Sequence, residues 1–333
     1  MLERVMVTGA SGFIGDNLVA ELLQRGVTVY GLARSPLRRS HPNLIAIQGD
    51  LLQPESYQQA LQQCDTLFHC AGHISFSAAD RAQAEAINIA GTKAVATAAL
   101  EAEPLRFVHL SACAVLGFRQ HADAPLLDES AAPLIARENG YAYSKWAAEQ
   151  EILTLTEQGL NAVIANISTV YGAGDRQMNS GSIIRSLRQG MRLIPPGGSS
   201  YIGIKDLLAG LLALAQNGRR GERYILNSEN LTYADLTRRI AVVVKAAPPS
   251  FVLPRVARRP AIAAAWSLER LQRLRGATGG VNLVTPQIIR ESFGYKYFSA
   301  AKAQRELGWQ PQQSLESAVA EAMAFYLKEG LLK

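Results

Sequence analysis

The sequence predicts an α/β fold, with a doubly wound parallel sheet followed by a smaller, mostly helical C-terminal region. Short apolar runs alternate with longer runs of helical periodicity over the first half of the chain. Strands that are apolar on both faces are typical of a parallel sheet covered by helices on both sides. A glycine-rich turn within residues 7–18, "VTGASGFIGDNL", joins the first predicted strand to the first predicted helix.

The predicted strands and helices follow one another in a regular order. The strands cover residues 3–9, 27–34, 43–50, 65–72, 106–112 and 161–172. The helices of this part cover residues 12–26, 80–102 and 141–158. After residue 172, segments rich in glycine and proline separate helices, and strands become sparse. We therefore divide the chain into residues 1–172, which form the sheet, and residues 173–333, whose later segments can cross back onto it.

Composition excludes several classes of protein. Of the 333 residues, 48% are hydrophobic and 19% are charged, and no apolar run is long enough to span a membrane. The N-terminus enters a strand pattern at once, so we expect no signal peptide. Three cysteines and five histidines lack the spacing of metal ligands, so we expect no metal. So few cysteines fit a reducing compartment, which favours the cytoplasm.

The net charge of +6 raises the question of an acidic partner. The arginines are mostly scattered and no nucleic-acid-binding motif is present, so we expect no nucleic acid partner. The exception is residues 255–275, where six arginines surround an apolar stripe. We interpret this segment as a helix with a solvated basic face over core residues, and peripheral contact with a membrane or an acidic partner as the alternative.

The glycine turn has the spacing Gly-x-x-Gly-x-x-Gly, one residue longer than the usual dinucleotide fingerprint. Glycines let the backbone pass close to a pyrophosphate, which then lies at the positive N-terminus of the following helix. The turn follows a strand and opens a helix, the context that supports a Rossmann-type dinucleotide-binding domain over residues 1–172. Residues 173–333 would then bind the substrate. The predicted cofactor contacts of the turn are Thr8, Gly9, Ser11, Gly12, Phe13, Ile14 and Gly15.

The end of the second strand indicates which dinucleotide is bound. An NAD site places an acidic residue there, whereas this chain has Arg34, followed by Arg38 and Arg39. A guanidinium suits a 2′-phosphate, so NADP is favoured and NAD is the alternative. Asp50, at the end of the third strand, is expected either to accept a hydrogen bond from the adenine amino group or to cap a helix.

The stretch "YAYSKWAAE" carries the predicted catalytic pair, Tyr141 and Lys145, four residues apart on one helical face. A phenol titrates near pH 10 and is a poor acid or base at neutral pH. A lysine cation one turn away, together with a positively charged nicotinamide, lowers that pKa. The phenol can then pass a proton to a carbonyl oxygen while hydride reaches the carbon. Tyr143 is too close in sequence to Lys145 to share its face.

Together these motifs resemble the extended short-chain dehydrogenase/reductases, the NAD(P)-dependent epimerase/dehydratase family. The resemblance covers nearly the whole chain and implies that Leu51, Ala71 and Gly72 also contact the cofactor. It also implies that Lys145 holds the nicotinamide ribose, and that a homodimer forms through the 141–158 helix and its neighbour. The further matching segments are "GDL" (49–51), "HCAG" (69–72), "NIAGT" (88–92), "STVYGAGD" (168–175), "YIGIKD" (201–206) and "KAQRELGWQP" (302–311).

One position departs from the family pattern. The family has a Ser or Thr five residues before the glycine that ends its "VYG" segment, and that hydroxyl polarises the substrate oxygen. Counting back from Gly117 gives Ala112, flanked by Ser111 and Cys113. Neighbours on a strand point to opposite faces, so either would need a local irregularity to act instead. We carry Ser111 as the candidate third catalytic residue.

Three further positions narrow the class of reaction within the family. Cys113 and Ala114 stand where family dehydratases have an Asp–Glu pair, which argues against a dehydratase. Ser199 stands where members acting on sugar nucleotides often have an arginine, although Arg185 or Arg219 could serve. Residues 251–290 are rich in Leu, Val, Ile and Ala, which suits an apolar substrate and resembles the dihydroflavonol reductase and 3β-hydroxysteroid dehydrogenase branch.

Three hypotheses result. The leading one is an NADP-dependent oxidoreductase that interconverts a ketone and a secondary alcohol on a mostly apolar small molecule, with Tyr141 as the acid–base group. The second is a sugar-nucleotide epimerase that holds NAD tightly. The third is a cofactor-bound scaffold or sensor without catalytic activity, which Ala112 favours and the Tyr141–Lys145 pair opposes.

Overall fold

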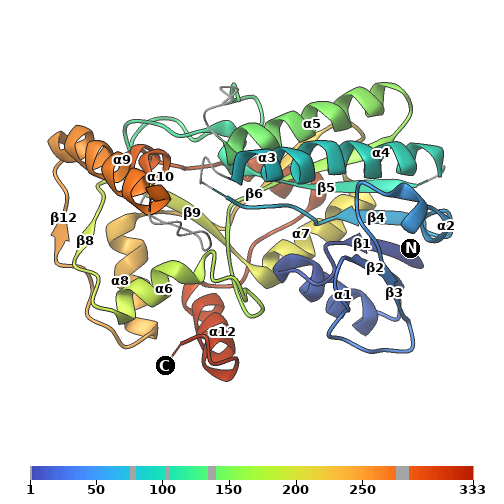
Figure 1. The fold of residues 1–333 in the computed structure, drawn as a ribbon, viewed down its shortest axis with the longest axis horizontal. Helices are drawn as coiled ribbons and strands as arrows, with labels where there is room; N and C mark the ends of the chain where they lie inside the picture. The colour runs from blue at the N-terminus through green and yellow to red at the C-terminus, as the bar shows by residue number, and fades with distance from the viewer. Residues whose placement is uncertain (1, 76–79, 103–104, 134–139, 275–284, 333) are drawn as a thin grey trace.

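A computed structural model describes residues 2–75, 80–102, 105–133, 140–274 and 285–332. Its centre is a seven-stranded sheet with the order β10-β6-β5-β4-β1-β2-β3, in which every neighbouring pair is parallel (Figure 1). The predicted α/β fold with a doubly wound parallel sheet is therefore confirmed. The strands are β1 (Arg4–Thr8), β2 (Thr28–Ala33), β3 (Leu44–Gln48), β4 (Thr66–His69), β5 (Arg106–Ala112), β6 (Asn161–Ile167) and β10 (Arg223–Leu226).

Helices cover both faces of this sheet because its central strands are apolar on both sides. Val5 and Val7 of β1 belong to one buried cluster with residues of α1 and α7, whereas Met6 belongs to a second cluster with residues of α4 and α5. Figure 1 shows these two pairs of helices on opposite faces. Their bounds are α1 (Phe13–Gln24), α7 (Ile204–Asn217), α4 (Thr92–Glu101) and α5 (Tyr141–Glu157).

The strand order reverses between β1 and β4, the first strand and the one beside it on the other half of the sheet. In open parallel sheets, ligands bind in the crevice outside the carboxyl ends of the strands at such a reversal. The turn after β1 carries the predicted glycine motif, and the loop after β4 carries Cys70, Ala71 and Gly72. The topology therefore brings two predicted cofactor segments to one place.

The remainder of the chain is mostly helical, as predicted, and also contains short strands. One three-stranded sheet has the order β11-β9-β7, and a two-stranded sheet pairs β8 with β12. Residues of α6, α8 and α12 form a separate hydrophobic core. The elements are β7 (Thr169–Tyr171), α6 (Gly181–Arg188), β8 (Leu193–Ile194), β9 (Gly198–Gly203), β11 (Glu229–Thr232), α8 (Tyr233–Val243), β12 (Phe251–Val252), η6 (Arg255–Ala257), α9 (Arg258–Leu274), α10 (Pro286–Ser292), α11 (Ala301–Leu307) and α12 (Leu315–Lys328).

Two predicted elements are divided in the structure. The strand expected over residues 161–172 becomes β6 and β7, which belong to different sheets because the chain leaves the large sheet at Ser168. The helix expected over residues 80–102 becomes α3 (Arg81–Glu85), the π-helical segment η3 (Ala86–Gly91) and α4. The remaining short helices are η1 (Pro54–Ser56), α2 (Gln58–Leu61) and η4 (Cys113–Leu116).

The sheet also draws on the chain beyond the expected boundary at residue 172. Its outermost strand β10 pairs with β6, and α7 covers β5 and β6. The second region is therefore interleaved with the first, and a cavity at their junction has walls from both. No helix in the described part of the chain is both long and apolar enough to cross a membrane.

Candidate active site

A cavity of about 1220 Å³ lies at the carboxyl ends of the central strands and extends into the second region. Its walls include the glycine turn, the loops after β2, β3 and β4, the start of α5, and segments of α6, β8, β9, α8 and α10. All but two of the predicted cofactor contacts line it, the exceptions being Thr8 and Lys145.

Each of the three glycines of the turn meets a different degree of crowding, which decides whether a side chain could replace its hydrogen. Gly9 has a φ of +66°, and a Cβ there would lie 2.8 Å from the backbone nitrogen of Ala71. A Cβ on Gly15 would lie 2.1 Å from the carbonyl oxygen of Gly9. Gly12 is milder, since its added Cβ would lie 3.2 Å from that same oxygen. Gly9 and Gly15 therefore permit backbone approaches that any side chain would prevent.

The turn leads directly into the N-terminus of α1, where Gly12 is the capping residue. It provides no side-chain cap for the first turn of the helix. Helix N-termini carry free N–H groups and a partial positive charge, which together bind phosphate. Ser11, Gly12, Phe13 and Ile14 all line the cavity at this point. These residues fit the pyrophosphate of a dinucleotide.

Thr8 is a buried residue that connects the glycine turn to the loop after β4. It is fully buried, and its Oγ1 accepts a hydrogen bond from the backbone nitrogen of Ala71 at 3.2 Å. The same oxygen lies 2.8 Å from Nδ1 of buried His69, whose Nε2 lies 3.0 Å from the hydroxyl of Thr92. Thr8 therefore fixes the loop after β4 beside Gly9 rather than lining the cavity.

The wall expected to contact the adenosine contains two of the three arginines named from the sequence, and also Asp50. Arg34 and Arg38 are exposed and line the cavity. Arg39 lies 3.4 Å from Asp16 and is not among the lining residues. Asp50 lines the cavity and also accepts a hydrogen bond from the backbone nitrogen of Leu52 at 2.9 Å, which holds the turn after β3.

Tyr141 and Lys145 lie on the first two turns of α5, as the spacing predicts. Tyr141 lines the cavity. Lys145 is 4% exposed, and its Nζ donates a hydrogen bond to the carbonyl oxygen of Leu110 on β5 at 2.6 Å. The lysine is therefore held between α5 and the sheet.

Burial sets the protonation of this pair. It raises the pKa of the Tyr141 phenol to about 12, opposite in direction to the decrease expected from Lys145, so the phenol is neutral at physiological pH and can act only as a proton donor there. Burial also lowers the pKa of Lys145 to about 8, although the carboxylate of Glu149 opposes that decrease. The site therefore holds a proton donor next to an ammonium group that loses its charge in the mildly alkaline range.

Position 112 confirms the departure noted from the sequence. Ala112, Cys113 and Ala114 line the cavity at the end of β5, and Ser111 is not among the lining residues. The hydroxyl of Ser111 instead donates to Oε1 of Glu149 on α5. Ser111 therefore faces away from the cavity, because adjacent residues of a strand point to opposite faces. In this structure it does not supply the missing hydroxyl group.

Glu149 is a buried residue that sequence reasoning did not single out. Its Oε1 also accepts from Nδ2 of Asn166 on β6 at 2.7 Å, and its Oε2 lies 3.5 Å from Arg223 on β10. Burial raises the pKa of this carboxyl group. Its hydrogen bonds with Ser111 and Asn166 and the charge of Arg223 oppose that increase. The network ties α5 to three adjacent strands. Its position four residues after Lys145, on the same helical face, was the available signal.

Asn88 performs a similar positioning role from the π-helical segment η3. Its side chain accepts from the backbone nitrogen of His73 at 2.8 Å and donates to the hydroxyl of Ser144 at 2.9 Å. Ser144 in turn donates to the carbonyl oxygen of Tyr141. Asn88 therefore links the loop after β4 to the first turn of the catalytic helix, and π-helical segments are frequent at such functional positions.

The far part of the cavity combines an apolar wall with polar side chains, which include Asn179 and Thr237. Among the lining residues are Ile194, Pro195, Ile288 and Ile289, together with the polar Ser199. The two arginines that could replace the family's diphosphate-binding arginine, Arg185 and Arg219, are not among the lining residues, and Arg219 pairs with Glu306 at 2.9 Å.

Lys296 is the lysine of this far wall. It lies 3.6 Å from Glu291, and that carboxylate and Tyr233 raise its pKa against the opposing effect of burial. All three residues line the cavity. They offer a substrate one charged pair and a phenol at the end remote from the glycine turn.

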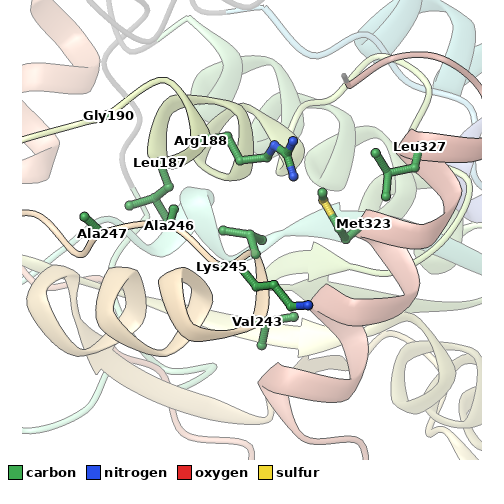
Figure 2. Close-up of a pocket in the computed structure, with 10 residues that line it drawn as sticks. Leu187, Arg188, Gly190, Val243, Lys245, Ala246, Ala247, Met323 and Leu327 are labelled. Atoms are coloured by element: carbon green, nitrogen blue, oxygen red, sulfur yellow. The ribbon is translucent and has the colours of Figure 1, made fainter.

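Two other observations bear on where the reaction takes place. Within the described residues, no group of three His, Cys, Asp or Glu side chains could hold a metal. A second, smaller pocket lies between α6, α8 and α12, and Figure 2 shows Arg188 and Lys245 beside apolar residues such as Met323. Its lining includes no tyrosine, histidine or carboxylate. The larger cavity, which Tyr141 lines, is therefore the candidate active site.

Comparison with known proteins agrees with this geometry. The sequence model of the NAD dependent epimerase/dehydratase family matches residues 5–227. The chain belongs to this family. It is therefore an NAD(P)-dependent enzyme of the short-chain dehydrogenase/reductase type, and the resemblance stated from the sequence is confirmed.

Similar members of the family match over nearly their full lengths. The chain is 33% identical to a putative dihydroflavonol 4-reductase of Synechocystis, over 100% of this chain and 97% of the relative. It is 30% identical to a 3-beta-hydroxysteroid dehydrogenase of Mycolicibacterium neoaurum, over 98% and 92%. The crystal structure of gox2253 superposes with a TM-score of 0.82 at 30% identity, covering 99% of this chain and 100% of that one.

Proposed function

We propose that this enzyme is an NADP-dependent oxidoreductase that interconverts a ketone and a secondary alcohol on a mostly apolar small molecule. The observation that carries the proposal is the position of Tyr141, which lines the same cavity as the glycine turn, while buried Lys145 lies one turn further along the same helix. The tyrosine is thus next to both a dinucleotide site and an apolar compartment.

The residues of this chain supply the proton and the orientation. When bound, a nicotinamide dinucleotide supplies a hydride for the carbonyl carbon. Tyr141, kept neutral by burial, donates its proton to the carbonyl oxygen, and Lys145 stabilises the resulting phenolate by its positive charge. Solvent then returns a proton to Tyr141. In the opposite direction the phenolate of Tyr141 accepts the proton of the alcohol.

Arg34 and Arg38 support NADP over NAD. Both line the cavity beside the loop after β2, where an NAD site has an acidic residue. Two guanidinium groups in that wall favour the additional phosphate of NADP. Binding titrations of Arg34→Ala and of the wild type with NADPH and NADH test this preference, which the variant should lose.

The apolar far wall and the names of two relatives support the substrate class. The relatives are named for a dihydroflavonol and a 3β-hydroxysteroid, which are ring compounds. Ile194, Ile288 and Ile289 provide apolar surface of the kind that binds such rings. Ser199, together with the distant Arg185 and Arg219, provides little support for a sugar diphosphate.

The test of the proposal is Tyr141→Phe, which removes one oxygen and keeps the ring. We expect turnover of apolar ketones with NADPH to fall by at least about 10²-fold, the usual contribution of general acid catalysis, with NADPH affinity unchanged within a few-fold. Retention of most activity would show that the mechanism is wrong. NAD that co-purifies and does not dissociate would instead favour the epimerase.

We also propose that the enzyme forms a homodimer through α4 and α5. The proposal rests on the resemblance to the family and on the packing of these two helices against each other on one face of the sheet. Light scattering of the purified protein tests it. A monomer at micromolar concentration would contradict it.

A further inference from the structure

Exposed apolar side chains gather at one end of the molecule. Among the described residues, twelve large hydrophobic side chains are exposed, and six of them come from β8, β12, η6 and α9. Figure 1 shows these elements at the end of the molecule remote from β3. We call five of these residues the end patch: Leu193, Phe251, Val252, Val256 and Trp266. Leu268 does not belong to it because residues two apart on a helix point to different faces, and Trp266 therefore does not share its face.

The side chains of the end patch are largely exposed to solvent. Val256 is 85% exposed, Trp266 59% and Leu193 56%. The stripe of α9 that was expected to be covered by core therefore leaves a tryptophan in solvent. Exposed apolar side chains that gather at one end of a molecule are typical of sites of interaction with proteins, membranes or ligands.

The patch is bordered by positive charge. Arg192, Arg259 and Arg270 are exposed, and none forms an ion pair with a described side chain. Arg255 is partly engaged, since it donates to the carbonyl oxygen of Gln120 and to the hydroxyl of Tyr295. Apolar residues including tryptophan, flanked by arginines on a helix, are typical of segments that lie in the interface of an anionic bilayer.

The patch is also continuous with the active-site cavity. Leu193 belongs to the patch and lines the cavity, and its neighbour Ile194 lines it as well. Phe251 and Val252 pair with these two residues through β12. The helix α9 packs on α10, whose Ile288 and Ile289 form another part of the cavity wall. The apolar surface therefore runs from solvent into the substrate compartment.

We infer that the end patch docks on the surface of an anionic lipid bilayer, so that the cavity faces the membrane. An isologous contact between two copies is less favourable, because it would bring the same unpaired arginines together. An anionic bilayer instead offers negative headgroups to the arginines and an acyl region to the apolar side chains. The docking is independent of the proposed function; only the entry of an apolar ketone from the bilayer rests on it.

The test is co-sedimentation of the full chain with vesicles of phosphatidylcholine, with and without about 30% phosphatidylglycerol, at about 0.1 M salt. We expect binding to the anionic vesicles at least tenfold stronger than to neutral ones, and a blue shift of tryptophan fluorescence. Trp266 is the exposed reporter, since Trp309 is buried and Trp146 is half-buried. Trp266→Ser with Val256→Ser should weaken binding at least tenfold and remove the shift.

Two further variants separate charge from apolar contact. Arg259→Glu with Arg270→Glu should weaken binding to anionic vesicles by at least tenfold, at about 1 kcal/mol or more per charge. The matched control, Ile45→Ser with Val242→Ser, removes two exposed apolar side chains elsewhere and should bind within twofold of the wild type. Thermal melts and NADPH titrations verify that all variants are folded.

Absence of binding to anionic vesicles, or equal loss in the control variant, would overturn the inference. So would a dimer that Trp266→Ser with Val256→Ser dissociates, because the patch would then be a contact between copies. Turnover of a water-soluble ketone without vesicles is measured in parallel. If that turnover persists while docking fails, the proposed function stands and only this inference falls.

Discussion

Gly9→Ala tests the physical basis of the cofactor turn. The added methyl group would lie 2.8 Å from the nitrogen and Cα of Ala71, against ordinary contact from 3.4 Å, so the two backbones must separate by about 0.6 Å. Gly9 also has a φ of +66°, where an L-residue costs roughly 1–2 kcal/mol. Overpacking adds about 1–3 kcal/mol. We therefore expect a loss of roughly 2–5 kcal/mol in the free energy of unfolding.

Gly308→Ala is the matched control. Gly308 has almost the same φ, +63°, but an added Cβ there would meet nothing within 4 Å. This variant should lose only the conformational part, roughly 1–2 kcal/mol, and keep its affinity for NADPH. The comparison isolates the close approach of Gly9 to Ala71 from the backbone conformation that both glycines share.

The assays are urea denaturation and fluorescence titration with NADPH. Because Ala71 and the turn both line the cavity, we expect Gly9→Ala to bind NADPH at least about tenfold more weakly than Gly308→Ala. If the two variants had equal stability and equal NADPH affinity, the close approach would have no energetic consequence and the explanation of Gly9 would be wrong.

Three other predictions concern protonation and the residues at the end of β5. Burial lowers the pKa of His69 to about 3 and that of His109 well below its usual value, so only the unfolded chain gains these protons. Stability should be full above pH 6.5 and fall toward pH 3, by up to roughly 2.7 kcal/mol per pH unit for two groups; constant stability in urea between pH 6 and 5 would contradict this. Because the pKa of Lys145 is lowered to about 8, kcat/KM for ketone reduction should decline above pH 8, and Lys145→Arg should move any remaining decline to higher pH. Ser111→Ala should leave kcat within twofold and cost about 1–3 kcal/mol of stability, because it removes the hydrogen bond to Glu149. Ala112→Ser should raise kcat about tenfold, because it places a hydroxyl group in the cavity. The opposite pattern in steady-state kinetics would refute the assignment of the two residues to opposite faces of β5.

Much of this site could be predicted because its signals are local. The glycine spacing between a strand and a helix indicates a phosphate-binding turn wherever it occurs. The four-residue spacing of Tyr141 and Lys145 places them on one helical face whatever surrounds the helix. Apolar runs alternating with helical periods predicted the covered parallel sheet. Each of these depends on residues close together in sequence, so the sequence by itself determined them.

Other features depend on contacts between distant segments, which only the tertiary structure decided. The strand pattern shows that Ser111 and Ala112 point to opposite faces, but not that Glu149 would take the hydroxyl of Ser111. The chain leaves the large sheet at Ser168 and returns to it as β10, and this path is likewise decided by packing. The same holds for Trp266, whose helical stripe resembles a core face although no described core covers it. Periodicity specifies which residues share a face, and tertiary packing decides what that face meets.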